Sequence, residues 1–511
     1  MNAAELVHAL RVQLGGTRLV VVANREPYIH VRRVERQRGL WAKLRGRSQS
    51  TSIECMRPAS GLVTALDPVM RACGGTWVGH GSGSADRLVV DERDRVAVPP
   101  EQPAYTLRRV WLTSQEEEGY YYGLSNNALW PLCHIAYARP EFNESDWWEY
   151  VSVNRRFADA VLEELDGDRS PAIVFAQDYH FALLPRFIKE ARPDVVVCHF
   201  WHIPWPNPEA FRICPWGSEI LDGLLGSDLL GFHIQYHCNN FVETVDRTLE
   251  ARVDREHFAV WRGGRPTYIK PFPISIDPAL WEHPGGAAAA AEARALREQS
   301  GIGPRKIVLG VDRLDYTKGI PERFHAFGRL LENRPEWRGR VVFLQIGAPS
   351  RDHLSRYRVL SDEVDAIVRG INDRFGTPDW QPVIYRREHH DHAAVAGWYR
   401  AADVCIVSSL HDGMNLVAKE FIASRTDQRG VLVLSRFTGA SRELDEALQV
   451  NPFAVDAFAD TLHDALSMDE DQQARRMRAL ALRVGRHTVY DWAAAVLTAA
   501  CRLAESQGAQ A

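Results

Sequence analysis

The sequence predicts an α/β protein built from two doubly wound, Rossmann-like domains. Short apolar runs rich in β-branched residues recur at 18–24, 172–177, 195–200, 306–312, 340–347, 404–409 and 430–435. Such runs are typical of parallel strands that are buried on both faces. Segments with the apolar spacing of helices, for example 157–165 and 320–337, lie between them. Because the alternation continues over 511 residues, more than one ordinary domain requires, we expect two domains.

The expected domain boundary lies in the segment SIDPALWEHPGG, at 275–286, which proline and glycine interrupt before an alanine-rich helical pattern begins. We therefore predict an N-terminal domain over 1–280 and a second domain over 281–485. The final segment, 486–511, has an amphipathic helical pattern. We expect it to pack back on the N-terminal domain.

The composition excludes several classes of protein. With 45% hydrophobic and 25% charged residues the chain resembles a globular protein, and no apolar run approaches the ~20 residues of a membrane span. The net charge of −5 gives no general attraction to nucleic acid. The first residues lack the features of a secretory signal, and the eight cysteines form no CxxC pair, so we expect a cytoplasmic protein with reduced thiols.

One segment, 31–58, departs from this charge balance and is predicted to be a basic loop insertion. From Arg32 to Arg57 it contains seven arginines and one lysine against two glutamates. It is either a solvated surface loop or a flap that carries positive charge toward an anionic ligand.

Polar side chains follow two of the predicted strands in the second domain, where parallel sheets bind ligands. Arg313 and Lys318 follow run 306–312 and suit a diphosphate, although a solvated loop with a salt bridge to Asp315 is the alternative. After run 404–409, Asp412-Gly413 predicts a turn and Asn415 a helix N-cap. Glu420, on that helix, could accept hydrogen bonds from a ribose diol or could be a surface ion-pair partner.

Similar positions in the first domain carry a second group of polar and aromatic residues. Asp178 follows run 172–177, and His202 follows run 195–200 within WHIPWPNPE, where prolines flank Trp205. His202 is either part of a preorganised pocket wall or a core histidine with satisfied hydrogen bonds.

Arg25 ends the first predicted strand and Gly61 opens a helical pattern. Tyr121 and Trp130, in GYYYGLSNNALWP, are either core residues or faces on which sugar rings stack.

Two histidine-rich clusters, 388–392 and His233/His237/Cys238, lack the second half of a zinc site, so we expect no metal. No P-loop, no GxGxxG after a strand and no GxSxG elbow is present.

These motifs, in this order, resemble the trehalose-6-phosphate synthase family of glycosyltransferases over roughly 18–500. The resemblance is carried by VVVANR, GYYYGLSNNALWP, QDYH, HIPWPNPE, SDLLGFH, RLDYTKGIPERF, QIGAPSR and HDGMNLVAKEF. It implies a GT-B fold with an acceptor-binding domain over 1–280, a nucleotide-sugar-binding domain over 281–485 and the active site in a cleft between them. It implies transfer of glucose, with retention, from a nucleotide sugar, foremost UDP-glucose, to glucose 6-phosphate, hence trehalose biosynthesis and osmoprotection. No cofactor is implied, a homo-oligomer is allowed, and a separate phosphatase would act on the product.

The same resemblance implies roles for individual residues. Those expected to bind the donor are Gly61, Arg313, Lys318, Asp412, Gly413, Met414, Asn415, Leu416 and Glu420. Those expected to bind the acceptor are Arg25, Trp77, Tyr121, Trp130, Asp178 and Arg351. Those expected to act directly in transfer are His202, Arg313, Lys318 and Asp412. The implied mechanism is a front-face substitution in which the leaving diphosphate helps to deprotonate the incoming hydroxyl.

Two positions depart from the family's pattern: His411 stands where an arginine is common, and His80 where a second tryptophan is common.

Two alternatives stay open. NREPY and GFHI…NNFV resemble glucosylglycerol-phosphate synthase, which uses ADP-glucose and glycerol 3-phosphate, whereas Arg351 favours a hexose phosphate as acceptor. A catalytically silent sugar-phosphate sensor would lack donor-site charges, but Arg313, Lys318 and Glu420 are all present.

Overall fold

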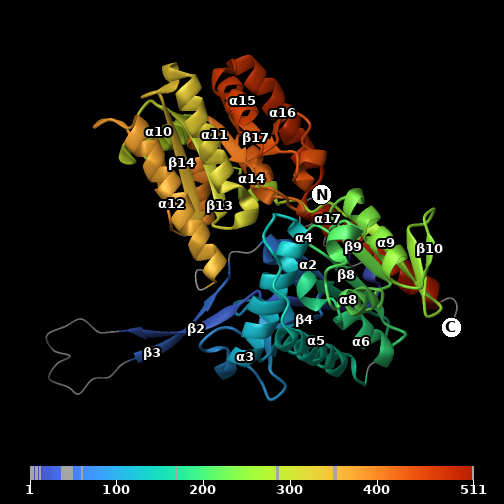
Figure 1. Cartoon of the computed structure of the whole chain (residues 1–511). Helices are drawn as coiled ribbons and strands as arrows, with labels where there is room; N and C mark the ends of the chain where they lie inside the picture. Colours follow the sequence, from blue (N-terminus) through green and yellow to red (C-terminus); the bar gives the residue numbers. More distant parts are fainter. Residues whose placement is uncertain are drawn as a thin grey trace. The chain divides into compact units, whose positions relative to one another are not determined.

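The computed structural model describes residues 5, 10, 13–35, 50–58, 61–167, 170–282, 287–348, 354–388 and 390–508 (Figure 1). The chain divides into two compact units. The N-terminal unit comprises Asn2–Cys133, Arg139–Phe272 and Ala493–Ala511, and the C-terminal unit comprises Pro273–Trp492 with the short segment His134–Ala138.

The N-terminal unit contains a ten-stranded sheet. Its strands, in spatial order, are β10 (Arg252–Asp254), β11 (Ala259–Arg262), β12 (Arg265–Pro271), β9 (Leu229–Phe232), β8 (Val196–Phe200), β7 (Ala172–Gln177), β1 (Arg18–Arg25), β4 (Thr76–His80), β6 (Tyr105–Val110) and β5 (Arg95–Val98). All neighbours from β12 to β6 are parallel, and the outer pairs are antiparallel. The strand order reverses between β1 and β7, the kind of position where open α/β sheets bind ligands.

Most helices of this unit lie in the segments that connect its strands. They are α2 (Gly61–Cys73), α3 (Ser114–Glu116), α4 (Trp130–His134), α5 (Glu144–Leu165), α6 (Leu184–Ala191), α7 (Pro208–Phe211), α8 (Gly217–Leu224) and α9 (Gln235–Thr248). A thirteen-residue π-helix, η3 (Glu117–Leu129), precedes α4. The two ends of the predicted basic insertion pair with each other as the antiparallel strands β2 (Ile29–Glu35) and β3 (Ser50–Met56). Residues 36–49, between these strands, lie outside the described residues.

The C-terminal unit contains a six-stranded parallel sheet. Its strands, in spatial order, are β15 (Val383–Arg386), β14 (Val341–Ala348), β13 (Lys306–Arg313), β16 (Val404–Val407), β17 (Val431–Ser435) and β18 (Leu448–Val450). Its helices are α10 (Ala287–Gln299), α11 (Ile320–Asn333), α12 (Ser355–Phe375), α13 (His392–Ala401), α14 (Leu416–Ser424), α15 (Val455–Ser467) and α16 (Glu470–Arg486). Figure 1 shows α10, α11 and α12 beside β13 and β14. The order reverses between β13 and β16.

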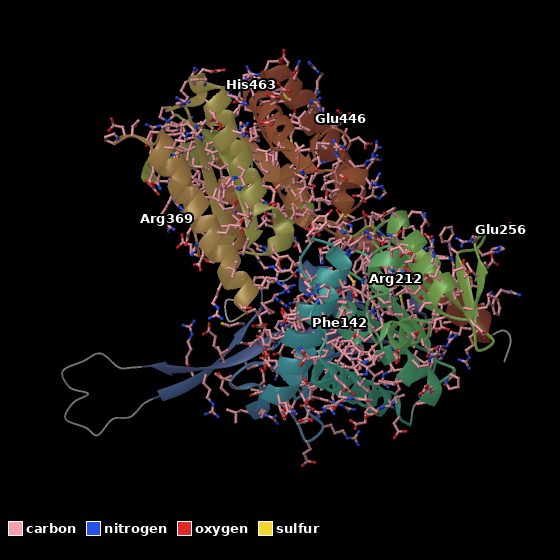
Figure 2. All side chains as sticks on the ribbon, in the orientation of Figure 1. Phe142, Arg212, Glu256, Arg369, Glu446 and His463 are labelled. Atoms are coloured by element: carbon pink, nitrogen blue, oxygen red, sulfur yellow. The ribbon has the colours of Figure 1, made fainter. Side chains whose placement is uncertain are left out.

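The sequence correctly predicted an α/β fold with two parallel-dominated sheets, because each predicted apolar run became a strand with buried residues. The last helix, α17 (Val489–Gly508), begins in the C-terminal unit and groups with the N-terminal unit from Ala493 onward. No helix in the described ranges is both long and apolar enough to cross a membrane. The charged residues labelled in Figure 2, Arg212, Glu256, Arg369 and Glu446, are all exposed.

Candidate active site

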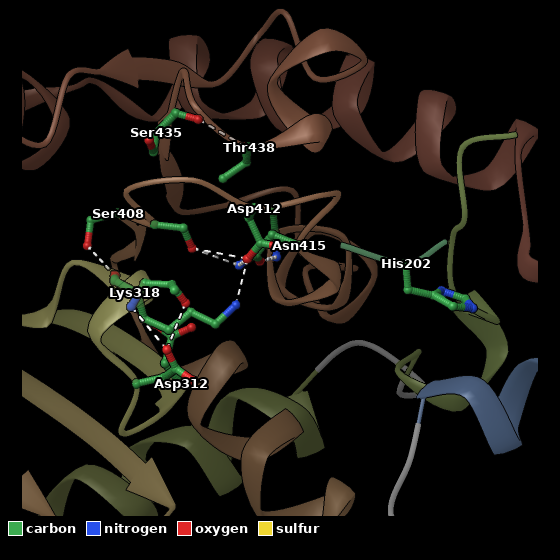
Figure 3. Close-up of polar contacts among 12 residues, drawn as sticks. His202, Asp312, Lys318, Ser408, Asp412, Asn415, Ser435 and Thr438 are labelled. Carbon is green, nitrogen blue, oxygen red and sulfur yellow. Dashed lines mark hydrogen bonds and ion pairs between the residues drawn. The ribbon is translucent and has the colours of Figure 1, made fainter. Parts of the chain in front are cut away.

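The strand reversal of the C-terminal unit brings Lys318 and Asp412 together (Figure 3). Lys318 ends the short helix η6 (Tyr316–Lys318) after β13, and Asp412 lies in the loop after β16. The Lys318 ammonium is 2.6 Å from Asp412 Oδ2, which also accepts hydrogen bonds from Ser409 Oγ and Asn415 Nδ2, both at 3.2 Å. The sequence had suggested Asp315 as an alternative partner, but Asp315 is buried and accepts from the Thr317 main chain and hydroxyl.

The charges of this pair stabilise each other. Burial opposes ionisation of both groups, but Asp412 and Asp312 outweigh it for Lys318 and raise the pKa of that ammonium. The Lys318 charge likewise lowers the pKa of Asp412 well below its ordinary value. Each side chain is only 14% exposed, so bulk water screens the interaction little. The site therefore holds one fixed cation and one fixed anion at neutral pH.

The backbone around Lys318 is held by close packing. Gly319 has φ +62°, and a Cβ there would lie 2.2 Å from the carbonyl oxygen of Ser408. Only glycine fits so close an approach at that φ. Arg323, which is fully buried, donates to Asp312 Oδ2 at 2.7 Å, to Ser408 Oγ at 2.7 Å and to the Lys318 carbonyl at 2.8 Å. These contacts set the end of β13 against the end of β16.

The loop Gly413–Leu416 is also rigid. Asn415 has φ +84°, an uncommon conformation for a residue with a side chain, and its Oδ1 accepts from the Ala418 main chain, the N-cap predicted for α14. Gly439 donates to the Asp412 carbonyl at 3.1 Å, and Ala440 donates to the Met414 carbonyl at 2.9 Å. The loop is therefore preorganised before the helix that begins at Leu416.

Glu420 and Arg313 occupy different environments near this loop. The Glu420 side chain, on α14, accepts a hydrogen bond from the Tyr399 hydroxyl at 3.0 Å. Burial, reinforced by Asp312, raises the pKa of Glu420 to about 7, although the Tyr399 hydrogen bond acts in the opposite direction. Glu420 is thus not the surface ion-pair partner that the sequence left open. Arg313, the last residue of β13, is exposed.

His411 makes a hydrogen bond within the C-terminal unit. Its Nδ1 lies 2.9 Å from the carbonyl oxygen of His134. A carbonyl can only accept, so Nδ1 carries the proton. Burial lowers the pKa of His411, which therefore stays neutral around pH 7.

In the N-terminal unit, Asp178 and His202 follow the adjacent strands β7 and β8. Asp178 has φ +73° and ψ 172°, a region that is otherwise almost confined to glycine. Its Oδ1 accepts from the main chains of Tyr179 at 2.9 Å and His202 at 3.3 Å. These hydrogen bonds offset the strain and hold the two strand ends together.

A hydrogen bond between two uncharged side chains fixes the orientation of the His202 ring. Its Nε2 lies 3.0 Å from Gln177 Oε1, an acceptor, so Nε2 carries the proton. Burial, followed by repulsion from His233 and other histidines, lowers the pKa of His202 well below its ordinary value. His233 Nε2 donates to the His202 carbonyl at 3.0 Å. A neutral, oriented imidazole suits hydrogen bonding to a hydroxyl.

The aromatic candidates come from the π-helix and the helix after it. Long π-helical segments are rare and often mark functional sites. Tyr121 lies on η3 and stacks on His180, with ring centres 5.5 Å apart and planes 8° apart. Trp130 begins α4, is 7% exposed and packs on Tyr179 at 5.9 Å.

Arg25 is the exposed last residue of β1, paired with His80 of β4 in the sheet register. Trp77, expected on the acceptor pocket, is fully buried, and its indole donates to the Arg25 carbonyl at 3.2 Å. The hydrogen bond from the Trp77 indole therefore holds the main chain at Arg25.

Two expected residues have limited structural description. Arg351 lies outside the described residues, and Gly61 is the exposed first described residue after 59–60. Within the ranges that are described, no three His, Cys, Asp or Glu side chains gather as a metal site requires.

Several supporting residues were not predicted from the sequence: Gln177, His233, Asp312, Arg323 and Tyr399. Each acts through a partner that is distant along the chain, so no local pattern marked it. The positive φ of Asp178 likewise had no sequence signal.

The chain matches a known protein family over almost its whole length. The family model Glycosyltransferase family 20 matches residues 17–502. This chain belongs to glycosyltransferase family 20. Most candidate donor residues lie in the C-terminal unit, and most candidate acceptor residues lie in the N-terminal unit.

Curated relatives of this family 20 enzyme align along nearly its whole length. The trehalose-6-phosphate synthase of Mycolicibacterium vanbaalenii is 38% identical over 498 residues, which cover 95% of this chain and 96% of that protein. A bifunctional trehalose-6-phosphate synthase/phosphatase of Thermoproteus tenax is 38% identical over 487 residues, which cover 93% of this chain and 62% of that protein.

Solved structures of the same family have the same fold. An E. coli structure bound with UDP-2-fluoro glucose aligns with a TM-score of 0.81 and 28% identity, covering 95% of this chain and 99% of that chain. An α,α-trehalose-phosphate synthase (UDP-forming) of Burkholderia xenovorans in complex with glucose-6-phosphate aligns with a TM-score of 0.77 and 29% identity, covering 93% and 98%. The family 20 chain thus has the GT-B fold.

Proposed function

We propose that this enzyme transfers glucose from UDP-glucose to glucose 6-phosphate, forming α,α-trehalose 6-phosphate and UDP with retention of the anomeric configuration. The observation that carries the proposal is the grouping of Lys318, Asp412 and the rigid loop Gly413–Leu416 at the strand reversal of the C-terminal unit. The relatives named above, and the ligands named with their structures, support it.

The donor half of the proposal uses the C-terminal unit. Lys318 and exposed Arg313 would hold the diphosphate, since two cations at a strand end suit its charge. Asp412 and the main chain of Gly413–Leu416 would bind the glucose hydroxyls, and Glu420 the ribose diol. On donor binding the Lys318 ammonium would exchange part of its contact with Asp412 for the phosphate oxygens.

The acceptor half uses mainly the N-terminal unit. Arg25, with Tyr121 and Arg351, would bind the 6-phosphate. Trp130 and Asp178 would line the acceptor glucose, and the neutral His202 would hydrogen-bond the donor sugar near its 6-hydroxyl.

The mechanism requires no protein nucleophile. The acceptor hydroxyl attacks the anomeric carbon on the face from which the diphosphate leaves, and its proton passes to the departing phosphate oxygen. As the bond between anomeric carbon and phosphate oxygen breaks, negative charge grows on the diphosphate. Lys318 and Arg313 stabilise that charge, and this electrostatic effect lowers the barrier. Binding energy from the acceptor phosphate orients the attacking hydroxyl.

One experiment tests the proposal: UDP-, ADP- and GDP-glucose are each combined with glucose 6-phosphate and glycerol 3-phosphate, and nucleoside diphosphate release is measured. We expect the highest kcat/KM for UDP-glucose with glucose 6-phosphate. Activity with glycerol 3-phosphate alone would replace this function by glucosylglycerol-phosphate synthesis. Binding of sugar phosphate without release of nucleoside diphosphate for any donor and acceptor would favour a sensor. A parallel series with EDTA should leave the rate unchanged, because we propose no metal cofactor.

We also propose that a separate phosphatase consumes the product and that the enzyme works in the cytoplasm.

A further inference from the structure

A buried group of ionisable residues lies directly behind Arg25. The Arg109 cluster, as we call it, consists of Glu26, His30, Asp86 and Arg109. Arg109 of β6 is fully buried, with Nε 2.8 Å from Glu26 Oε2 and Nη2 2.9 Å from Asp86 Oδ1. Its Nη2 also lies 2.9 Å from His30 Nδ1. All four residues belong to the N-terminal unit.

Hydrogen bonds tie the main chain at Arg25 and Glu26 to two neighbouring segments. Glu26, the next residue, accepts hydrogen bonds from Ser82 N at 2.9 Å and Ser82 Oγ at 3.2 Å. The Arg25 carbonyl accepts a hydrogen bond from the Trp77 indole. The main chain on the carboxyl side of Arg25 is therefore held at two points, while the Arg25 guanidinium is exposed.

The cluster also holds the base of the β2–β3 hairpin. Asp86 accepts from the His30 main chain at 2.7 Å, and Arg109 donates to the Tyr28 carbonyl at 3.0 Å. The segment from Arg25 to His30 is consequently attached at three points to a guanidinium and a carboxylate that have no exposed surface.

A network of this kind is a costly way to stabilise a fold. Desolvation of buried charges offsets much of their attraction, so apolar residues of equal volume are often as stabilising. What the network does supply is a fixed direction for each group it contacts. We propose that the Arg109 cluster is a positioning device that sets the Arg25 guanidinium for the acceptor phosphate. This inference rests on the proposed function of Arg25.

The cluster has a defined protonation state. Burial, and then the hydrogen bond to Asp86, raise the pKa of Glu26 to about 8, against the influence of Arg109. Burial opposes ionisation of Asp86, but hydrogen bonds from His30 and Glu26 lower its pKa to about 2. At neutral pH, Glu26 is therefore the protonated partner, and Asp86 balances Arg109.

Alkaline pH should loosen this arrangement. Ionisation of Glu26 adds a second buried negative charge that the single guanidinium cannot balance. Because the folded pKa of Glu26 lies above its ordinary value, its stabilising contribution is complete at acidic pH and is lost as the pH rises through about 8.

Two other ionisable groups near this site, Cys55 and His80, have pKa values shifted in opposite directions. Burial raises the pKa of the Cys55 thiol of β3, and burial lowers the pKa of His80 of β4. Glu101 also acts electrostatically on Cys55. The phosphate of glucose 6-phosphate is a dianion above about pH 7, since its second pKa is ~6.

The test compares the wild type with Glu26→Gln, an uncharged mimic of the protonated acid, and Glu26→Ala. The KM values for both substrates and kcat are measured from about pH 7 to about pH 9. At about pH 9, one unit above the pKa, only about one tenth of Glu26 stays protonated, so the wild-type KM for glucose 6-phosphate should rise about tenfold. The KM for UDP-glucose and kcat should change less than about twofold. Glu26→Gln should keep the neutral-pH KM and lose the alkaline rise, whereas Glu26→Ala should show a raised acceptor KM throughout.

Glu190→Gln, an exposed carboxylate on α6, is the matched control and should follow the wild type. An alkaline rise that persists in Glu26→Gln, or equal changes in the KM of both substrates, would overturn the positioning role, because a merely structural group affects both sites alike. If the wild type transfers nothing to glucose 6-phosphate, the proposed function fails separately. In that case the Kd of glucose 6-phosphate is measured by calorimetric titration at about pH 7 and about pH 9, for the wild type and for Glu26→Gln. If the Kd of the wild type rises with pH no more than that of Glu26→Gln, the positioning role of the cluster is rejected.

Discussion

The ammonium group of Lys318 lies 2.6 Å from the carboxylate of Asp412, so the two residues assigned to the donor's diphosphate and glucose are an ion pair with each other. They come from loops 94 residues apart that follow adjacent parallel strands. Each keeps the other ionised, since Asp412 raises the pKa of Lys318 and Lys318 lowers that of Asp412. The pair is therefore both part of the fold and the proposed centre of charge stabilisation.

Removing the Lys318 charge should separate these two roles. Lys318→Ala should lower kcat by about 10²–10³, as loss of one preorganised group facing the leaving group does, with little change in acceptor KM. It should also destabilise the fold by about 3 kcal/mol, because Asp412 becomes a buried unpaired charge. The double variant Lys318→Met/Asp412→Asn should recover most of that stability in denaturant unfolding but none of the turnover. Lys270→Ala, which removes an exposed lysine, is the control. Turnover that recovers together with stability would show that Lys318 acts only through the fold.

Glu420 should make donor binding depend on pH. A ribose diol donates hydrogen bonds to the carboxylate, whereas the protonated acid has fewer acceptor positions. With a pKa of about 7, Glu420 gains its proton as the pH falls, so the KM for UDP-glucose should rise below about pH 7. The Tyr399 hydrogen bond lowers this pKa, so Tyr399→Phe should move the acidic limb to higher pH. Initial-rate profiles for both proteins test this, and identical limbs would exclude Glu420 as the titrating group.

His411 should contribute no limb to the pH profile near neutrality. Its pKa is lowered by burial, and the bond from Nδ1 to the His134 carbonyl keeps the ring in one neutral tautomer. His411→Arg should therefore leave the shape of the kcat/KM profile unchanged above about pH 6.5, the ordinary histidine pKa. Loss of an acidic limb in the variant would instead identify His411 as a titrating group of the reaction.

The strained backbone of Asp178 can be measured directly. Asp178→Gly and Asp178→Ala both remove the carboxylate that accepts from Tyr179 and His202, but only glycine adopts φ +73°, ψ 172° without strain. Asp178→Gly should therefore be more stable than Asp178→Ala by about 1–3 kcal/mol in denaturant unfolding. Both should lose affinity for glucose 6-phosphate. Equal stabilities would show that the local backbone relaxes at no cost.

Much of the site was predictable from residue type and position after a strand. Lys318, Asp412 and Glu420 follow predicted parallel strands, and the carboxyl ends of such strands meet at one edge of a sheet. Asn415 was a correct N-cap prediction because capping depends on residues only three positions apart. The alternatives for Glu420 and Lys318 could not be resolved in this way, since they depended on the distant partners Tyr399 and Asp412.

The sequence by itself determined that the chain has two sheets dominated by parallel strands, the positions of seven of those strands, and the polar residues that follow them, because apolar periodicity and short-range turn chemistry are local properties. Only the tertiary structure decided which charges pair, which histidine nitrogen carries the proton, and that Trp77 supports Arg25 from a buried position. It also decided that Glu26, His30, Asp86 and Arg109 form one cluster. These features depend on burial and on contacts between residues far apart in the chain, which change pKa and orientation without leaving a pattern in the sequence.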